Sequence, residues 1–151
     1  DDFRKYMQVQ TIGHDKVNQL RHVRFFKDMD GMHEHMRKHA AILRPKFELV
    51  QKTLEEGLGG LEIGSWTKPK GGYFISFDSL DGCAKRIVSM AKEAGLVLTG
   101  AGATYPYGKD PKDCNIRIAP SFPTLEELGK AAELFVICVK LASAEKLLGE
   151  E

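Results

Sequence analysis

The stretch K-P-K-G-G-Y-F-I-S-F, residues 68–77, predicts a tight turn that leads directly into a β-strand. Proline, glycine and lysine at 68–72 are typical of a turn, and the aromatic and β-branched residues at 73–77 favour a strand. Glycines allow a second backbone or a ligand to approach closely, and Tyr73 and Phe74 could form the wall of a pocket. The alternative is a simple turn into a core strand.

A second strand is predicted for N-I-R-I-A, residues 115–119. Side chains alternate along a strand, so Ile116 and Ile118 should share one face while Arg117 projects from the other. Arg117 is either an ordinary surface residue or a ligand for a carboxylate, which a planar guanidinium can bind through two parallel hydrogen bonds. The sequence A-P-S-F-P at 119–123 should stiffen the chain as it leaves this strand.

Helical patterns flank these two strands. We expect a short helix after Asp15, which is a suitable N-cap. A long helix should follow Asp30-Gly31, with a kink at Pro45 and an end at Gly57, Gly59 and Gly60. A third helix should run from about Ala84 to Gly95. The last helix should begin with a capping box at Thr124-Leu125-Glu126-Glu127.

Shorter patterns complete the predicted fold. Strands are expected at 61–66 and 96–99, while residues 1–10 show no clear period. The order of elements predicts an α+β (α/β layered) class, with a small, mostly antiparallel sheet. Helices should pack on one face of this sheet, and the long kinked helix should precede it.

Composition limits the class of protein. The 151 residues suggest one domain, and 42% hydrophobic residues are enough for a core. A formal net charge of +1 gives no basic footprint for nucleic acid, and no apolar run is long enough for a membrane span. Three widely spaced cysteines predict buried thiols in a reduced, cytoplasmic setting. Because the first residue is Asp1, we expect a fragment or a processed product.

Two weaker motifs have simpler explanations. His35 and His39 are four residues apart and could share a metal, but no third ligand is evident, which favours a polar helix face. Gly100-Ala101-Gly102 follows a predicted strand and partly mimics a dinucleotide-binding loop. The third glycine is missing and Pro106 opposes a helix there, so a turn with positive φ explains the glycines better.

Taken together, residues 68–74 and 115–119 resemble the small C-terminal domain of fold-type I, class I/II aminotransferases, which depend on pyridoxal 5'-phosphate. The stretch Q-L-R-H-V-R-F-F at 19–26 is similar to a bacterial branch of MocR-like proteins and aspartate aminotransferases. The resemblance covers nearly the whole chain and includes the order of its elements. It implies a connecting segment at 1–27 followed by the small domain at 28–151, with residues 1–151 forming a single domain.

The resemblance also implies a division of chemistry. Arg117 matches the arginine that binds the substrate α-carboxylate, and Tyr73 and Phe74 match a segment beside the substrate. The substrates would be an aspartate- or alanine-like amino acid and a 2-oxo acid, in a homodimer. The Schiff-base lysine, the aspartate that pairs with the pyridine nitrogen and the phosphate cup belong to the family's large domain, and none is recognised here. The isolated chain is therefore expected to be inactive and free of cofactor.

Two other classes stay open from the residues themselves. One is a stand-alone α+β domain that binds or senses a small acid through Arg117. The other is an interaction module that pairs through its long helices. Neither would need pyridoxal phosphate.

Overall fold

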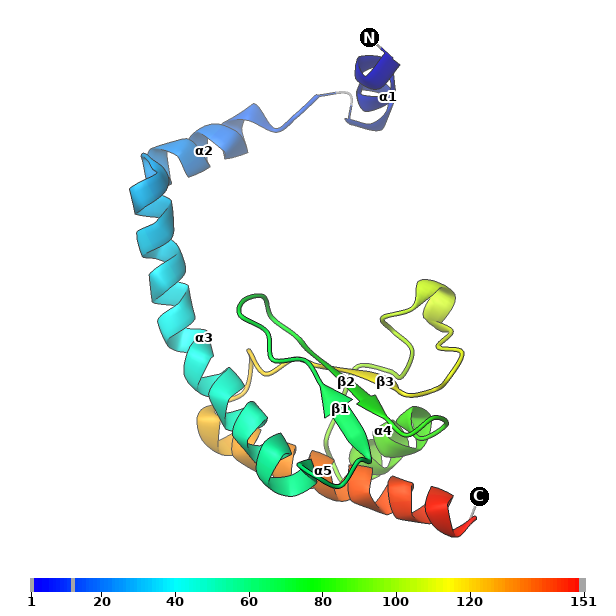
Figure 1. The fold of residues 1–151 in the computed structure, drawn as a ribbon. Coiled ribbons are helices and arrows are strands. Elements are labelled where there is room, and N and C mark those ends of the chain that lie inside the picture. Colours follow the sequence, from blue (N-terminus) through cyan, green and yellow to red (C-terminus); the bar gives the residue numbers. More distant parts are fainter. Residues whose placement is uncertain (1, 12, 150–151) are drawn as a thin grey trace. The chain divides into compact units, whose positions relative to one another are not determined.

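The computed structural model describes residues 2–11 and 13–149, and the chain divides into two compact units, Asp1–Ile42 and Leu43–Glu151. The helices are α1 (Asp2–Thr11), α2 (Lys16–Phe26), α3 (Met29–Leu58), α4 (Ala84–Glu93) and α5 (Leu125–Leu148), with a 3-10 turn, η1, at Pro106–Gly108. The strands are β1 (Gly64–Trp66), β2 (Ile75–Ser79) and β3 (Asn115–Ile118). Figure 1 labels these elements.

The first unit is helical. Asp15 caps α2 as predicted, because its Oδ1 accepts a hydrogen bond from the Asn18 N–H at 2.9 Å. Helix α1 was not predicted. It buries no residue, so its sequence needs no apolar stripe, and the periodic signal that reveals a packed helix is absent.

Helix α3 confirms the predicted long helix and contains Pro45. It ends at Leu58, within the glycine-containing stretch at Gly57, Gly59 and Gly60 that was predicted to end it. Gly57 lies inside the helix, where a side chain would collide with Val136, because a Cβ would come within 2.6 Å of that side chain. The later residues Val50, Leu54 and Leu58 form the buried face of α3.

The sheet has the order β1-β2-β3, and both pairings are antiparallel. Helices α4 and α5 pack on one of its faces (Figure 1). The class is therefore α+β with a small antiparallel sheet, as the sequence predicted. In the register of β2 with β3, Ser76 lies opposite Arg117 and Asp78 lies opposite Asn115.

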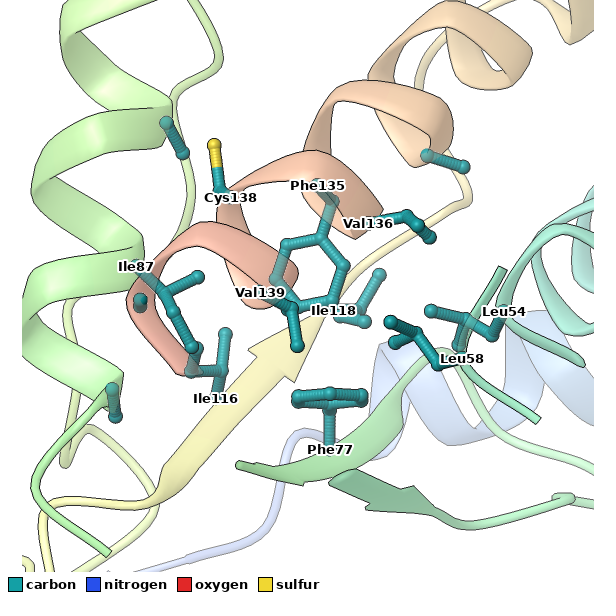
Figure 2. Packing of buried hydrophobic residues seen from close by; sticks show 14 of the residues in the cluster. Leu54, Leu58, Phe77, Ile87, Ile116, Ile118, Phe135, Val136, Cys138 and Val139 are labelled. Atoms are coloured by element: carbon teal, nitrogen blue, oxygen red, sulfur yellow. The ribbon is translucent and has the colours of Figure 1, made fainter. Parts of the chain in front are cut away.

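The core lies between this sheet and the helices. Figure 2 shows Phe77 of β2 below Phe135 and Val139 of α5, with Leu54 and Leu58 of α3 beside them. The rings of Phe77 and Phe135 meet edge to face with centroids 5.1 Å apart, which is a favourable geometry for aromatic pairs. Ile116 and Ile118 of β3 are buried in the same core.

Two strand predictions needed correction. Residues 96–99 form no strand in the described chain: Leu96 and Leu98 pack against the core, while Val97 is 81% exposed. The side chains do alternate between the core and solvent, but no strand in the described part of the chain lies beside this segment to supply a ladder of hydrogen bonds. The strand predicted at 61–66 begins only at Gly64, because Glu62 has a φ of 57° that interrupts extended backbone.

The strand predicted at residues 73–77 begins two residues later than expected. Tyr73 and Phe74 precede β2, which begins at Ile75. Gly72, with a φ of 88°, turns the chain just before them. The turn at 68–72 is therefore confirmed, and the pairing starts where Ile75 meets Ile118.

The capping box of α5 is confirmed. The Thr124 hydroxyl accepts from the Glu127 N–H, and the Glu127 carboxylate accepts from the Thr124 N–H at 2.9 Å.

No helix in the described part of the chain is long and apolar enough to cross a membrane. Two statements about domains stay predictions: that residues 1–27 are a connecting segment before a small domain at 28–151, and that residues 1–151 form a single domain.

All three cysteines are free and buried, as predicted. Burial raises the pKa of the Cys83, Cys114 and Cys138 thiols, because a thiolate is poorly solvated there. These thiols behave as small apolar side chains.

Candidate substrate-carboxylate site

Arg117 lies on the face of the sheet opposite the core. Its neighbours Ile116 and Ile118 are 0% and 9% exposed in the core, whereas Arg117 is half-buried on the other side. The alternation predicted for this strand is therefore confirmed. An arginine on the core face would lose its hydration, so the register of β3 is fixed by its isoleucines.

Phe74 contacts the guanidinium of Arg117. The guanidinium carbon lies 4.5 Å from the centroid of the Phe74 ring, which is a cation–π geometry. Phe74, Ser76 and Asp78 are on the same face by alternation, and Phe74 is diagonal to Arg117 across the two strands. The structure thus brings together two of the three predicted site residues.

Tyr73, the third predicted residue, is 54% exposed. It lies before β2, next to Phe74 in the sequence. No hydrogen bond or ring contact joins Tyr73 to Arg117 within the described residues.

The donors of Arg117 are only partly satisfied. One terminal nitrogen donates a long hydrogen bond of 3.4 Å to the Thr99 hydroxyl. The Nε–H is buried and has no hydrogen-bond partner among the described residues. An unsatisfied buried donor costs on the order of 1–3 kcal/mol, so the environment of Arg117 is incomplete as a hydrogen-bonding site.

A polar network beside Arg117 was missed by the sequence analysis. Asn115 is 6% exposed, and its side chain bonds to Ser76, Asp78 and Thr104. Alternation along the two strands could have placed Ser76, Asp78 and Asn115 on the face of Arg117. The sequence carries no signal for Thr99 and Thr104, because both lie outside the strands.

Asp110 organises the chain that enters β3. Its carboxylate accepts from the backbone N–H groups of Lys112, Cys114 and Asn115 at 3.0, 2.8 and 2.8 Å. These hydrogen bonds, that of Asn115 above all, hold the pKa of Asp110 below its usual range. The negative charge of Asp110 in turn raises the pKa of the Tyr105 phenol.

The residues around Arg117 form no site for pyridoxal phosphate. All but one of the described lysines are exposed, and the exception, Lys46, donates to the Ser121 carbonyl at 2.6 Å. Lys68 is exposed and pairs with Glu55 at 3.1 Å. A lysine that forms a Schiff base is activated by a desolvated setting, which none of these has.

The predicted histidine pair lies in the first unit. The ring centroids of His35 and His39 are 4.5 Å apart. The rings of Phe25 and Phe26 each pack against His35, with centroids 5.3 Å from its ring. Within residues 2–11 and 13–149, no group of three histidine, cysteine or acidic side chains could hold a metal ion.

Comparison with solved structures defines the class of fold. An aspartate transaminase from Corynebacterium glutamicum matches with a TM-score of 0.88 and 47% identity, over 95% of this chain and 34% of that chain. The alpha-aminoadipate aminotransferase LysN of Thermus thermophilus, complexed with N-(5'-phosphopyridoxyl)-L-leucine, matches with a TM-score of 0.71. At 17% identity over 93% of this chain and 35% of that chain, it shows the fold alone. The fold is one found within aminotransferases.

The family follows from the sequence. The family model described as aspartate amino-transferase matches residues 1–151, and the chain belongs to this family. Aspartate aminotransferase of Corynebacterium glutamicum is 50% identical over 137 residues, which are 91% of this chain and 32% of that protein. A Mycolicibacterium smegmatis protein, provisionally named an aminotransferase, is 51% identical over 97% of this chain and 34% of its own length. The chain thus spans about a third of the length of these curated relatives.

Proposed function

We propose that the full-length protein is a pyridoxal-phosphate-dependent aminotransferase and that this chain supplies its substrate-clamping domain. The amino group would move between an aspartate- or alanine-like amino acid and a 2-oxo acid. The observation that carries the proposal is the guanidinium of Arg117, held against Phe74 with its Nε–H unsatisfied. Membership of the aspartate amino-transferase family supports the reaction class.

Arg117 would bind the substrate α-carboxylate. A carboxylate offers two acceptor oxygens in a plane, and a guanidinium offers two parallel N–H donors in the same geometry. Phe74 covers one face of the guanidinium and so restricts the direction in which those donors point. Tyr73, exposed and on the neighbouring position, would contact the substrate from the side.

Binding of the substrate carboxylate and the chemical step would be carried out by different groups. When bound, pyridoxal phosphate supplies an electron sink that stabilises negative charge at the substrate α-carbon. Residues of this chain would orient the substrate by its carboxylate, which lowers the entropic part of the barrier. Because no described lysine is buried in a suitable setting, the isolated chain would be inactive. In the full-length protein we also expect a homodimer, a cytoplasmic setting and no binding of nucleic acid.

The experiment is steady-state transamination by the full-length protein and its Arg117→Lys variant, with cofactor content measured in both. Lysine keeps the positive charge but loses the two-donor geometry. A hydrogen bond to a charged group contributes about 1.5–3 kcal/mol, so kcat/KM should fall by roughly tenfold to several hundredfold. Cofactor content should stay the same. Equal kcat/KM values, or a loss explained entirely by missing cofactor, would contradict the role of Arg117.

A further inference from the structure

The side chain of Asn115 joins three separate parts of the second unit. Its Oδ1 accepts from the Thr104 hydroxyl at 2.6 Å. Its Nδ2 donates to the Asp78 carboxylate at 2.7 Å and to the Ser76 hydroxyl at 2.9 Å. One amide thereby connects β3 to β2 and to the loop at residues 100–113.

The orientation of this amide is determined by its partners. An ionised carboxylate can only accept hydrogen bonds, so the atom that faces Asp78 must be the nitrogen. The oxygen then faces Thr104, whose hydroxyl can donate. Both N–H donors are used and the oxygen has a partner, so the buried amide is satisfied only when all three partners are in place.

Asn115 also lies close to Arg117 in the sheet. The two residues lie on the same face of β3, two positions apart, and Ser76 is the residue opposite Arg117 on β2. Asp110 fixes the backbone at Cys114 and Asn115 from the same loop that Thr104 belongs to. Hydrogen bonds therefore link the loop to the strand that carries Arg117.

We propose that Asn115 is a positioning residue for the carboxylate site. Its hydrogen bond with Thr104 would hold the loop at 100–113 in a fixed position relative to Arg117. This inference rests on the proposed function of Arg117. The bond to Thr104 is the informative one, because Thr104 is exposed and its substitution removes only the partner of the Asn115 oxygen, leaving the bonds to Ser76 and Asp78. Substitution of Asn115 itself would leave Asp78 without its amide donor and could prevent folding.

The test uses the full-length holoenzyme with Thr104→Val and Thr104→Ser. Valine matches the shape of threonine without the hydroxyl, whereas serine retains it. The readouts are the inhibition constant of succinate, used as an unreactive carboxylate probe, and KM and kcat for L-aspartate. We expect Thr104→Val to raise the inhibition constant and KM together by about three- to tenfold, the loss of one hydrogen bond. Thr104→Ser should stay within about twofold of the wild type on the same reasoning.

A purely structural role would predict a different result. Thr104→Val would then lower the thermal midpoint while leaving the succinate constant unchanged, which would overturn the proposal. The same holds if Thr104→Ser fails to restore binding. Arg117→Lys is measured in parallel to separate the two hypotheses. If it weakens succinate and Thr104→Val does not, only the role of Asn115 fails. If Arg117→Lys leaves succinate binding unchanged, the proposed role of Arg117 fails and the role of Asn115 falls with it.

Discussion

The guanidinium carbon of Arg117 lies 4.5 Å from the centre of the Phe74 ring, although the two residues are far apart in the sequence. The contact results from the antiparallel pairing of β2 with β3, in which Ser76 faces Arg117. Phe74 is then the diagonal neighbour on the same face, within reach of a long side chain.

Replacing Phe74 with leucine should weaken substrate binding moderately. A cation–π contact at an exposed site contributes about 0.5–1 kcal/mol, so KM for the amino acid should rise roughly two- to fivefold. Steady-state kinetics of the full-length Phe74→Leu variant measure this effect. Phe122→Leu is a matched control, because Phe122 is 96% exposed. An equal rise in KM for both variants would show that the ring contact does not position Arg117.

Removing the charge of Asp110 should destabilise the fold in a pH-dependent way. Its carboxylate has a pKa below the usual range, so its stabilising contribution is present above the titration range of an ordinary aspartate and is lost as pH falls through the lowered pKa. Asp110→Asn should therefore unfold at lower urea than the wild type at pH 7. The difference should shrink in strong acid. A difference independent of pH would contradict this assignment.

Gly102 should not tolerate a side chain. Its φ is 79°, and an added Cβ would come within 2.6 Å of the Gly108 carbonyl oxygen. Gly102→Ala should cost at least about 1–2 kcal/mol, the usual penalty for left-handed backbone, and more from the clash. Chemical denaturation of Gly102→Ala and Gly71→Ala tests this, since Gly71 has open space around it. Equal stabilities would mean that the loop adapts freely.

The isolated chain should not retain pyridoxal phosphate on a specific lysine. The described lysines are exposed apart from Lys46, whose ammonium is engaged by the Ser121 carbonyl. After incubation with the cofactor, borohydride reduction and dialysis, mass spectrometry should find only scattered, substoichiometric adducts. One stoichiometric adduct on a single lysine would refute the expectation that the Schiff-base lysine lies elsewhere.

Much of the fold could be predicted because its signals are local. The capping box at Thr124 and Glu127, the Asp15 cap of α2 and the alternation of Ile116, Arg117 and Ile118 each depend on neighbours within a few residues. The exposed helix α1 escaped prediction because nothing requires its surface to be apolar. Residues 96–99 alternate like a strand, but strand pairing depends on a distant partner that local sequence does not specify.

The candidate site likewise has one feature that the local sequence predicts and several contacts that it does not. The sequence by itself determined that Arg117 leaves the core face, because two flanking isoleucines must be buried and a strand has a period of two. Only the tertiary structure decided what meets the guanidinium: Phe74 through the β2–β3 register, and Thr99 from a segment outside the sheet. Likewise, only the folded chain brings Thr104 to Asn115. These contacts join distant residues through short-range forces, so they exist only once the sheet and its loops are assembled.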